Sequence, residues 1–118
     1  MKRLFIILLI ILGCQQQEKV SVDVFLLQTD LKLAVKNLEV EREKMQILCC
    51  ESKFSHDGIW GDNGKAYGIA QFHERTFIEL QKRARLPFIS WTNQEDQIKL
   101  LDWAIRNGYT KLWSCSKG

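Results

Sequence analysis

The sequence lacks a long hydrophobic run, an excess of one charge and a cluster of histidines. The apolar run Leu4–Leu12 is too short to cross a bilayer, which takes ~20 residues in a helix. A net charge of +3 over 118 residues is too even to indicate a nucleic-acid partner, which calls for a basic face or stripe. His56 and His73 have neither the spacing of metal ligands nor a nucleophile partner, so we interpret both as surface or structural residues. The length leaves room for one small domain and excludes a second enzyme domain.

The first residues have the pattern of an export signal. Lys2 and Arg3 precede the apolar run and Gly13 follows it, which is typical of a secretory signal peptide. The order Ile-Leu-Gly-Cys ending at Cys14 resembles the processing site of bacterial lipoproteins, in which the cysteine becomes the N-terminus and carries the lipid. The resemblance implies that residues 1–13 are removed, that Cys14 anchors the chain to a membrane, and that the protein faces the periplasm or cell surface. The alternatives are an ordinary signal cleaved nearby and an uncleaved signal anchor.

Export would place the remaining cysteines in an oxidising compartment, where disulfides persist. With Cys14 set aside, Cys49, Cys50 and Cys115 predict one bridge and one spare thiol. Adjacent residues on a helix point about 100° apart, so only one of Cys49 and Cys50 can face Cys115 well. We favour the pair Cys50–Cys115 and keep Cys49 as the rival partner.

The N-terminal part of the mature chain is expected to be a tether over residues 14–28. Val20, Val22 and Val24 alternate with polar residues, which favours a short strand there. Residues 29–118 are then expected to form an α+β domain that is mainly helical, with its core in residues 46–115.

A first helix of this domain is predicted to begin at a cap on Thr29 or Asp30 and to end at Glu51. Its predicted apolar face consists of Leu31, Ala34, Val35, Leu38, Met45, Leu48 and Cys49. Part of this series has heptad spacing, but the length is too short for a coiled coil, and a monomer is expected.

Two further helices are predicted after a turn-rich loop that contains regularly spaced glycines. One begins at His73 or Glu74, ends at Ala84 and buries Phe77, Leu80 and Ile78. The other opens with a capping box at Thr92–Glu95 and ends at Gly108. Three of the four tryptophans, Trp91, Trp103 and Trp113, are expected in the core.

Glu51 is the candidate catalytic residue. Cutting a glycosidic bond at neutral pH requires a proton on the leaving oxygen, and a carboxylic acid supplies it when an apolar setting lifts its pKa. The run Met45–Cys50 before Glu51 is almost wholly apolar, and the nearest basic residue in sequence is Lys53. The competing interpretation is an ordinary glutamate on a solvated helix face.

A second motif gives this glutamate a context. Glu51-Ser52 at a helix end, followed after a loop by Tyr-Gly-Ile-Ala-Gln at Tyr67–Gln71, resembles the core of the lysozyme-like lytic transglycosylases, the soluble lytic transglycosylase and goose-type lysozyme group. The resemblance covers about Gln46–Cys115. It departs from the family at the second motif, where Ile-Ala stands in place of Leu-Met, and in the short length of the domain.

The resemblance implies a lysozyme-like fold and cleavage of the bond between N-acetylmuramic acid and N-acetylglucosamine in peptidoglycan glycan strands. Glu51 would act first as acid and then as base, with no cofactor or metal. Ser52, Tyr67 and Gln71 would bind the substrate, and Trp60 in the loop would stack on a sugar. Each of these four also has a plain structural interpretation, as a packing, turn or helix-end residue.

Two other functions remain open at this point. A hydrolytic muramidase would need a second carboxylate, for which Asp57 and Asp62 are the nearest candidates, although both also suit turns. A non-catalytic cell-wall-binding lipoprotein would keep the groove without turnover.

Overall fold

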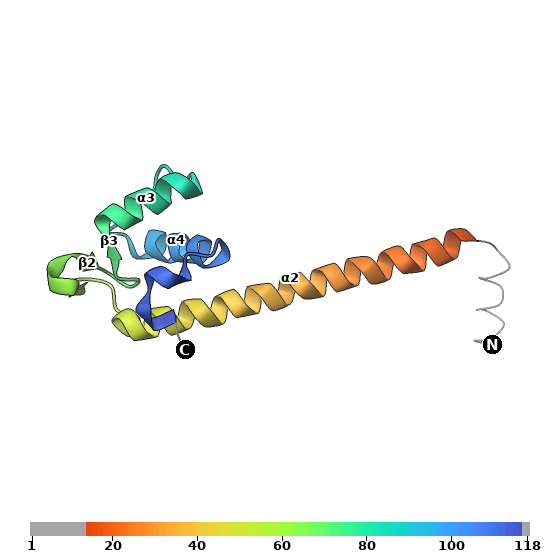
Figure 1. Cartoon of the computed structure of the whole chain (residues 1–118), viewed down its shortest axis with the longest axis horizontal. Coiled ribbons are helices and arrows are strands. Elements are labelled where there is room, and N and C mark those ends of the chain that lie inside the picture. The colour runs from red at the N-terminus through yellow and green to blue at the C-terminus, as the bar shows by residue number, and fades with distance from the viewer. Residues whose placement is uncertain (1–13, 117–118) are drawn as a thin grey trace. The chain divides into compact units, whose positions relative to one another are not determined.

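The computed structural model describes the backbone of residues 14–116 (Figure 1). The predicted signal peptide, residues 1–13, lies outside the described residues, and so does the side chain of Cys14. The elements in chain order are α2 (Cys14–Ser52), β1 (Trp60–Gly61), η1 (Asp62–Gly64), β2 (Ala66–Tyr67), β3 (Phe72–His73), α3 (Glu74–Ala84), α4 (Gln94–Arg106), η2 (Thr110–Leu112) and η3 (Ser114–Ser116). A mainly helical α+β architecture is therefore confirmed.

Helix α2 begins at Cys14, so the strand predicted at Val20–Val24 is wrong, and residues 14–28, which were predicted to be a tether, are helical. The sequence from residue 14 to residue 52 contains neither glycine nor proline, and three valines lower helix propensity only slightly. Thr29 is inside the helix, where its Oγ1 donates to the Phe25 carbonyl at 2.9 Å, so it is not the predicted cap. Within the described residues, no helix is both long and apolar enough to cross a membrane.

The chain divides into an N-terminal helical unit that ends at Asn37 and a domain that begins at Leu38. In the domain, α2 buries Val40, Ile47 and Leu48, whereas Leu38 and Met45 are exposed. The predicted apolar face of this helix is therefore wrong at most of its positions. The helix carries two apolar stripes, and the domain covers the one that also presents Lys44, whose Nζ pairs with the Asp102 carboxylate of α4 at 3.0 Å.

The core of the domain lies among α2, the three-stranded sheet, α3 and α4. Its buried members are Val40, Ile47, Leu48, Ile69, Ala70, Phe72, Phe77, Leu80, Leu100, Leu101, Ala104, Ile105 and Trp113. The ring of Phe72 meets the edges of Phe77 and Trp113 at centroid distances of 5.4 and 5.2 Å. Trp113 is buried as expected, while Trp91 and Trp103 pack against the core and are only partly buried.

The strands form one antiparallel sheet in the order β1-β2-β3. Trp60 pairs with Tyr67, and Tyr67 pairs with Phe72. The turn between β2 and β3 is therefore Gly68–Gln71, the last four residues of the Tyr67–Gln71 motif. The sheet fixes both ends of this turn.

Helices α3 and α4 agree with their predicted ranges. Phe77 and Leu80 are buried as expected, but Ile78 is exposed. The N-cap of α4 is Asn93 and not Thr92, because the Asn93 side chain accepts a hydrogen bond from the Asp96 amide at 3.0 Å. The chain leaves α4 through Gly108, whose φ of +84° is in the left-handed region.

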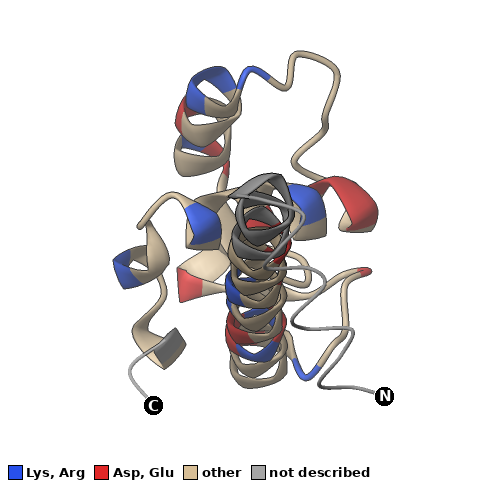
Figure 2. Cartoon of the chain, turned by 90° about the vertical axis from the view of Figure 1, so that its right-hand side faces the viewer, with Lys and Arg blue, Asp and Glu red and all other residues tan. Residues whose placement is uncertain are grey.

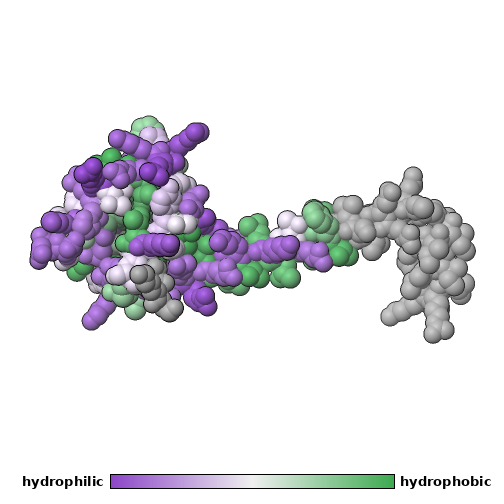
Figure 3. Space-filling model, in the orientation of Figure 1, coloured by the Kyte–Doolittle hydropathy of each residue, from purple (hydrophilic) through white to green (hydrophobic). Residues whose placement is uncertain are grey.

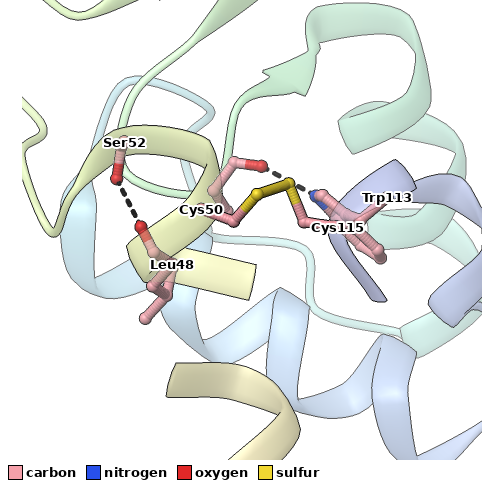
Figure 4. Close-up of a disulfide and its surroundings, with 6 residues drawn as sticks. Leu48, Cys50, Ser52, Trp113 and Cys115 are labelled. Atoms are coloured by element: carbon pink, nitrogen blue, oxygen red, sulfur yellow. Dashed lines mark hydrogen bonds between the residues drawn. A yellow bond between two sulfur atoms is a disulfide. The ribbon is translucent and has the colours of Figure 1, made fainter. Parts of the chain in front are cut away.

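The disulfide joins Cys50 and Cys115, as favoured from the sequence, with a Cα–Cα distance of 5.9 Å (Figure 4). It ties the last turn of α2 to η3 near the end of the chain. Beside it, Trp113 Nε1 donates to the Ala70 carbonyl at 2.7 Å. Cys49, the rival partner, is a free and exposed cysteine.

Candidate functional site

Glu51 is the penultimate residue of α2 and is half-buried. Burial removes water from its carboxyl group and raises its pKa above the ordinary 4.5. Within the described residues, no basic side chain pairs with this carboxylate to oppose the shift. An acid in this setting holds its proton closer to neutral pH than an exposed glutamate does.

Ser52 joins the end of α2 to the second motif. Its Oγ donates to the Ile69 carbonyl at 2.7 Å, and the Leu48 carbonyl is also within reach at 3.1 Å. Trp113 Nε1 donates to the carbonyl of the neighbouring residue, Ala70. The structure therefore brings the two recognised motifs together, with the residue next to Glu51 bonded to the turn that ends at Gln71.

Two buried polar side chains hold this turn in place. His56 Nδ1 accepts from the Ile69 amide at 3.0 Å, and its Nε2 lies 2.8 Å from the Thr92 carbonyl. Because Nδ1 accepts, the proton of a neutral ring is on Nε2, where it is donated to Thr92. His56 is thus a structural residue of the interior. Of the two interpretations made from the sequence, a surface residue or a structural one, the second is confirmed.

Gln97 of α4 is the second buried side chain that fixes the turn, and it was not predicted from the sequence. Its Oε1 accepts from the Ala70 amide at 3.0 Å, while its Nε2 donates to the carbonyls of Tyr67 and Trp91 at 2.8 and 2.7 Å. The side chain is fully buried. A signal was present, because Gln97 shares a helix face with Leu100, Leu101 and Ala104, and a polar residue on an apolar face needs hydrogen-bond partners.

Gly68 is packed closely against the side chains of His56 and Gln97. Its φ is +85°, and a Cβ built on it would lie 2.6 Å from both His56 Cε1 and Gln97 Nε2. A side chain at this position would therefore clash with His56 and with Gln97, the two side chains that fix the turn.

We therefore expect Gly68→Ala to destabilise the domain far more than Gly64→Ala. Gly64 has nearly the same φ, +84°, but open space around its Cβ position, so alanine there costs only the left-handed conformation, about 1 kcal/mol. Gly68→Ala adds overpacking of a filled site, about 2 kcal/mol more in the free energy of unfolding. Urea unfolding of both variants measures the difference, and equal losses would contradict the close packing.

Gln71 closes the turn with a left-handed φ of +51°. Its Nε2 donates to the carbonyls of Ile59 and Gly68 at 3.1 and 2.8 Å, so both amide hydrogens are used inside the loop. Its Oε1 lies against Gly61. The predicted contact between Gln71 and a sugar stays a prediction, and the amide has a defined part in shaping the loop.

Trp60, Tyr67 and Trp91 form an aromatic cluster beside this turn. The Tyr67 ring centroid lies 4.7 Å from that of Trp60 and 5.8 Å from that of Trp91. Tyr67 Oη accepts from the Gly58 amide at 3.3 Å. The Trp60 side chain is 56% exposed, so one large ring is open to solvent on a packed aromatic base.

The two candidate second carboxylates lie in the loop. Asp62 has a left-handed φ, and its Oδ2 lies 2.8 Å from His73 Nε2, so this carboxylate has a place in the turn and a polar partner. Asp57 is exposed. Among the described residues, no three histidine, cysteine or acidic side chains come together in a way that could hold a metal ion.

A small hollow of about 190 Å³ lies beside the turn. Its walls are Gln71, Phe72, His73, Thr76, Leu112 and Trp113. In the view of Figure 2, basic and acidic residues are interspersed along α2 and over the domain, in keeping with the small net charge.

The raised pKa of Glu51 predicts a pH-dependent stability difference between the wild type and Glu51→Gln. A carboxyl group whose folded-state pKa is raised contributes stability that is complete below its unfolded value of 4.5 and is lost as the pH rises through the folded-state value. Glutamine does not titrate, so the wild type should lose free energy of unfolding relative to the variant as the pH rises from 4.5 through the folded-state pKa. Urea unfolding at several pH values measures this, and a constant difference would contradict a buried carboxyl.

The arrangement as a whole provides one half-buried acid at a helix end, a turn locked by buried hydrogen bonds, and an exposed aromatic ring that packs on Tyr67 of that turn's motif. A protonated carboxyl group of this kind can donate to a leaving oxygen, and an aromatic ring can stack on the apolar face of a sugar. Comparison of the chain with models of protein families, with curated proteins and with solved structures finds no match.

Proposed function

We propose that the protein is a lytic transglycosylase with a lysozyme-like domain, which cleaves the bond between N-acetylmuramic acid and N-acetylglucosamine in peptidoglycan. One observation supports the proposal: Ser52, the residue after the half-buried Glu51, bonds to Ile69, so the end of α2 and the Tyr67–Gln71 turn lie against each other. This is the order and proximity that the resemblance to the family implies.

The proposed reaction uses Glu51 twice. The protonated carboxyl group donates to the glycosidic oxygen as the bond to the muramyl C1 breaks, and the N-acetyl group of the substrate shields the developing cation. The carboxylate then takes the proton of the muramyl hydroxymethyl group, whose oxygen attacks C1 and closes a 1,6-anhydro ring. Glu51 ends in its starting protonation state, so the cycle needs one acid and neither a metal nor a cofactor.

The surroundings of Glu51 suit this sequence of steps. Burial keeps the proton on the acid for the first step, and the absence of a basic partner among the described residues leaves the carboxylate available as the base. Trp60 offers its exposed ring to a sugar of the glycan strand, while Tyr67 and Trp91 hold that ring from behind. Ser52 links the turn to the helix end through the Ile69 carbonyl, and Gln71 shapes the turn through the Gly68 carbonyl.

The proposal includes export and a lipid anchor at Cys14. The substrate lies outside the cytoplasmic membrane, and the Cys50–Cys115 disulfide suits an oxidising compartment. Metabolic labelling with a radioactive fatty acid tests the anchor, and a mature protein without label would contradict it.

The hydrolase alternative is weaker because only one of its two candidate carboxylates, the exposed Asp57, is left without a polar partner among the described residues. Asp62 is paired with His73, and Asp57 is exposed in the loop. A hydrolase needs one of them free to act as nucleophile or to activate water beside the sugar.

Digestion of purified sacculi by the full-length protein, followed by mass analysis of the soluble products, tests the proposed reaction. We expect muropeptides that end in a 1,6-anhydro ring and are lighter by one water than hydrolysis products. Products with reducing ends would show a hydrolase, and binding without release would show a wall-binding protein. Either outcome overturns the proposal.

A further inference from the structure

Helix α2 carries a hydrophobic stripe that the domain does not cover. Val24, Leu31, Leu38 and Met45 follow one another at intervals of seven residues, and their side chains are 48, 65, 71 and 53% exposed. We call these four residues and the interleaved Gln28, Val35, Arg42 and Cys49 the outer stripe. Figure 3 shows hydrophobic side chains exposed along this helix. Solvated apolar side chains in such a regular series mark a surface that binds a partner.

The outer stripe points away from the side of α2 that packs on the domain. At 100° per residue, the mean direction of Leu38, Met45 and Cys49 is roughly 170° from that of the covered residues Val40 and Ile47, and roughly 80° from that of Leu48, which is also covered. A second helix can therefore lie along the outer stripe without displacing anything from the core.

The spacing of the outer stripe is that of a coiled coil. Val24, Leu31, Leu38 and Met45 occupy d positions of a heptad, and Gln28, Val35, Arg42 and Cys49 occupy the a positions. The sequence alone predicted a helix from residue 29, which left too few heptads and led us to expect a monomer. The helix begins at Cys14, so the series from Val24 to Cys49 lies wholly within it and approaches four heptads, the length at which the pattern becomes meaningful.

We propose that two copies of this chain associate in parallel along the outer stripe, and that the two Cys49 residues form a disulfide across the dimer. In a parallel dimer, equivalent a positions face each other across the seam. Cys49 is free, exposed and at an a position, in a chain whose other described cysteines are paired. An odd cysteine in a protein that forms a disulfide is suited to intermolecular pairing.

The charges around the seam also favour a second copy as the partner. Arg42 is the one charged a residue of the outer stripe, and two such residues would repel each other in the seam. Glu39 and Glu41 occupy the flanking e and g positions, and Glu41, which also pairs with Lys44 of its own chain at 2.7 Å, is at the g position that adjoins Arg42 of the other copy. The segment is therefore complementary to itself, and a polar a residue of this kind fixes the register.

The covalent step is an ordinary thiol–disulfide exchange. Two Cys49 thiols lose two protons and two electrons and form one S–S bond, while an oxidising disulfide takes them up and becomes two thiols. The conditions that form Cys50–Cys115 supply such an oxidant.

Two measurements on the full-length protein in mild detergent test this proposal. Incubation with oxidised glutathione and a non-reducing gel should give a band of twice the chain mass, which Cys49→Ser should abolish. Sedimentation of Cys49→Ser without reductant should still show a dimer, because the seam holds it. Leu31→Glu in that background should raise the dissociation constant at least about tenfold, since the charge enters the seam of both copies.

Leu33→Glu is the matched control. Leu33 lies two residues away on the same helix and is 58% exposed, but it is outside the outer stripe. It should leave the dissociation constant nearly unchanged. A monomeric Cys49→Ser protein would contradict association along the outer stripe. Equal effects of Leu31→Glu and Leu33→Glu on the dissociation constant would contradict it as well. A dimer that forms no Cys49 disulfide under oxidising conditions would overturn the parallel arrangement.

Discussion

Glu51→Gln should reduce the release of soluble muropeptides from sacculi by at least about a hundredfold, because a positioned acid contributes 10²–10⁴-fold to such a reaction. Glutamine keeps the size and shape of the side chain but can neither donate a proton to the leaving oxygen nor accept one from the muramyl hydroxymethyl group. Rates of release at neutral pH, measured on the same batch of sacculi, give the ratio.

Two controls separate a catalytic loss from a folding loss. The variant should unfold at the same or a higher urea concentration than the wild type at neutral pH, since it removes a buried charge. Glu79→Gln, an exposed glutamate of α3, should keep full activity. An active, folded Glu51→Gln protein would remove the acid from the mechanism.

Removing the disulfide should cost about 4 kcal/mol in the free energy of unfolding, by the chain-entropy model for a loop of this length. The bridge spans a sequence separation of 65 residues, so it restricts most of the domain in the unfolded state. The double variant Cys50→Ser/Cys115→Ser leaves no unpaired partner, and urea unfolding against the oxidised wild type measures the loss.

Cys49→Ser, at the exposed neighbouring position, should change the free energy of unfolding by less than about 0.5 kcal/mol in the monomer. The protein concentration in this comparison has to be well below the dissociation constant of the proposed dimer, so that only the monomer is measured. Equal stability of the double variant and the wild type would show that the bridge contributes little to holding η3 against α2.

The parts of the fold that could be predicted are those whose signals are local. Helix α3 ends close to where Pro87 forbids its continuation, and α4 begins at capping residues that precede a regular apolar period. Helix geometry allows only one of Cys49 and Cys50 to face Cys115 well, and the structure confirms the favoured pair Cys50–Cys115.

Helix α2 was predicted less well because its sequence supports two interpretations of burial. Leu31, Leu38 and Met45 form one apolar stripe and Val40 and Ile47 belong to another, and periodicity alone does not say which the domain covers. The choice depends on long-range contacts such as that between Lys44 and Asp102. The alternation of valines near its start favours a strand, but the segment contains no helix breaker and the structure is helical there.

The candidate site divides in the same way. Glu51 could be singled out from its apolar neighbours, and the structure places it half-buried at a helix end. The hydrogen bonds from His56 and Gln97 to the turn could not be predicted from residue spacing, because each side chain bonds to a backbone group far away in the sequence. The same is true of the link from Ser52 to Ile69.

The most direct test of the account is the titration of the Glu51 carboxyl carbon by NMR, with and without a soluble N-acetylated glycan fragment. We expect the free protein to show a pKa above 4.5 for this carboxyl group, and saturation with the fragment to change both its pKa and the signals of the Trp60 ring. A Glu51 carboxyl that titrates at 4.5 and does not respond to the glycan would contradict an acid placed at a sugar site.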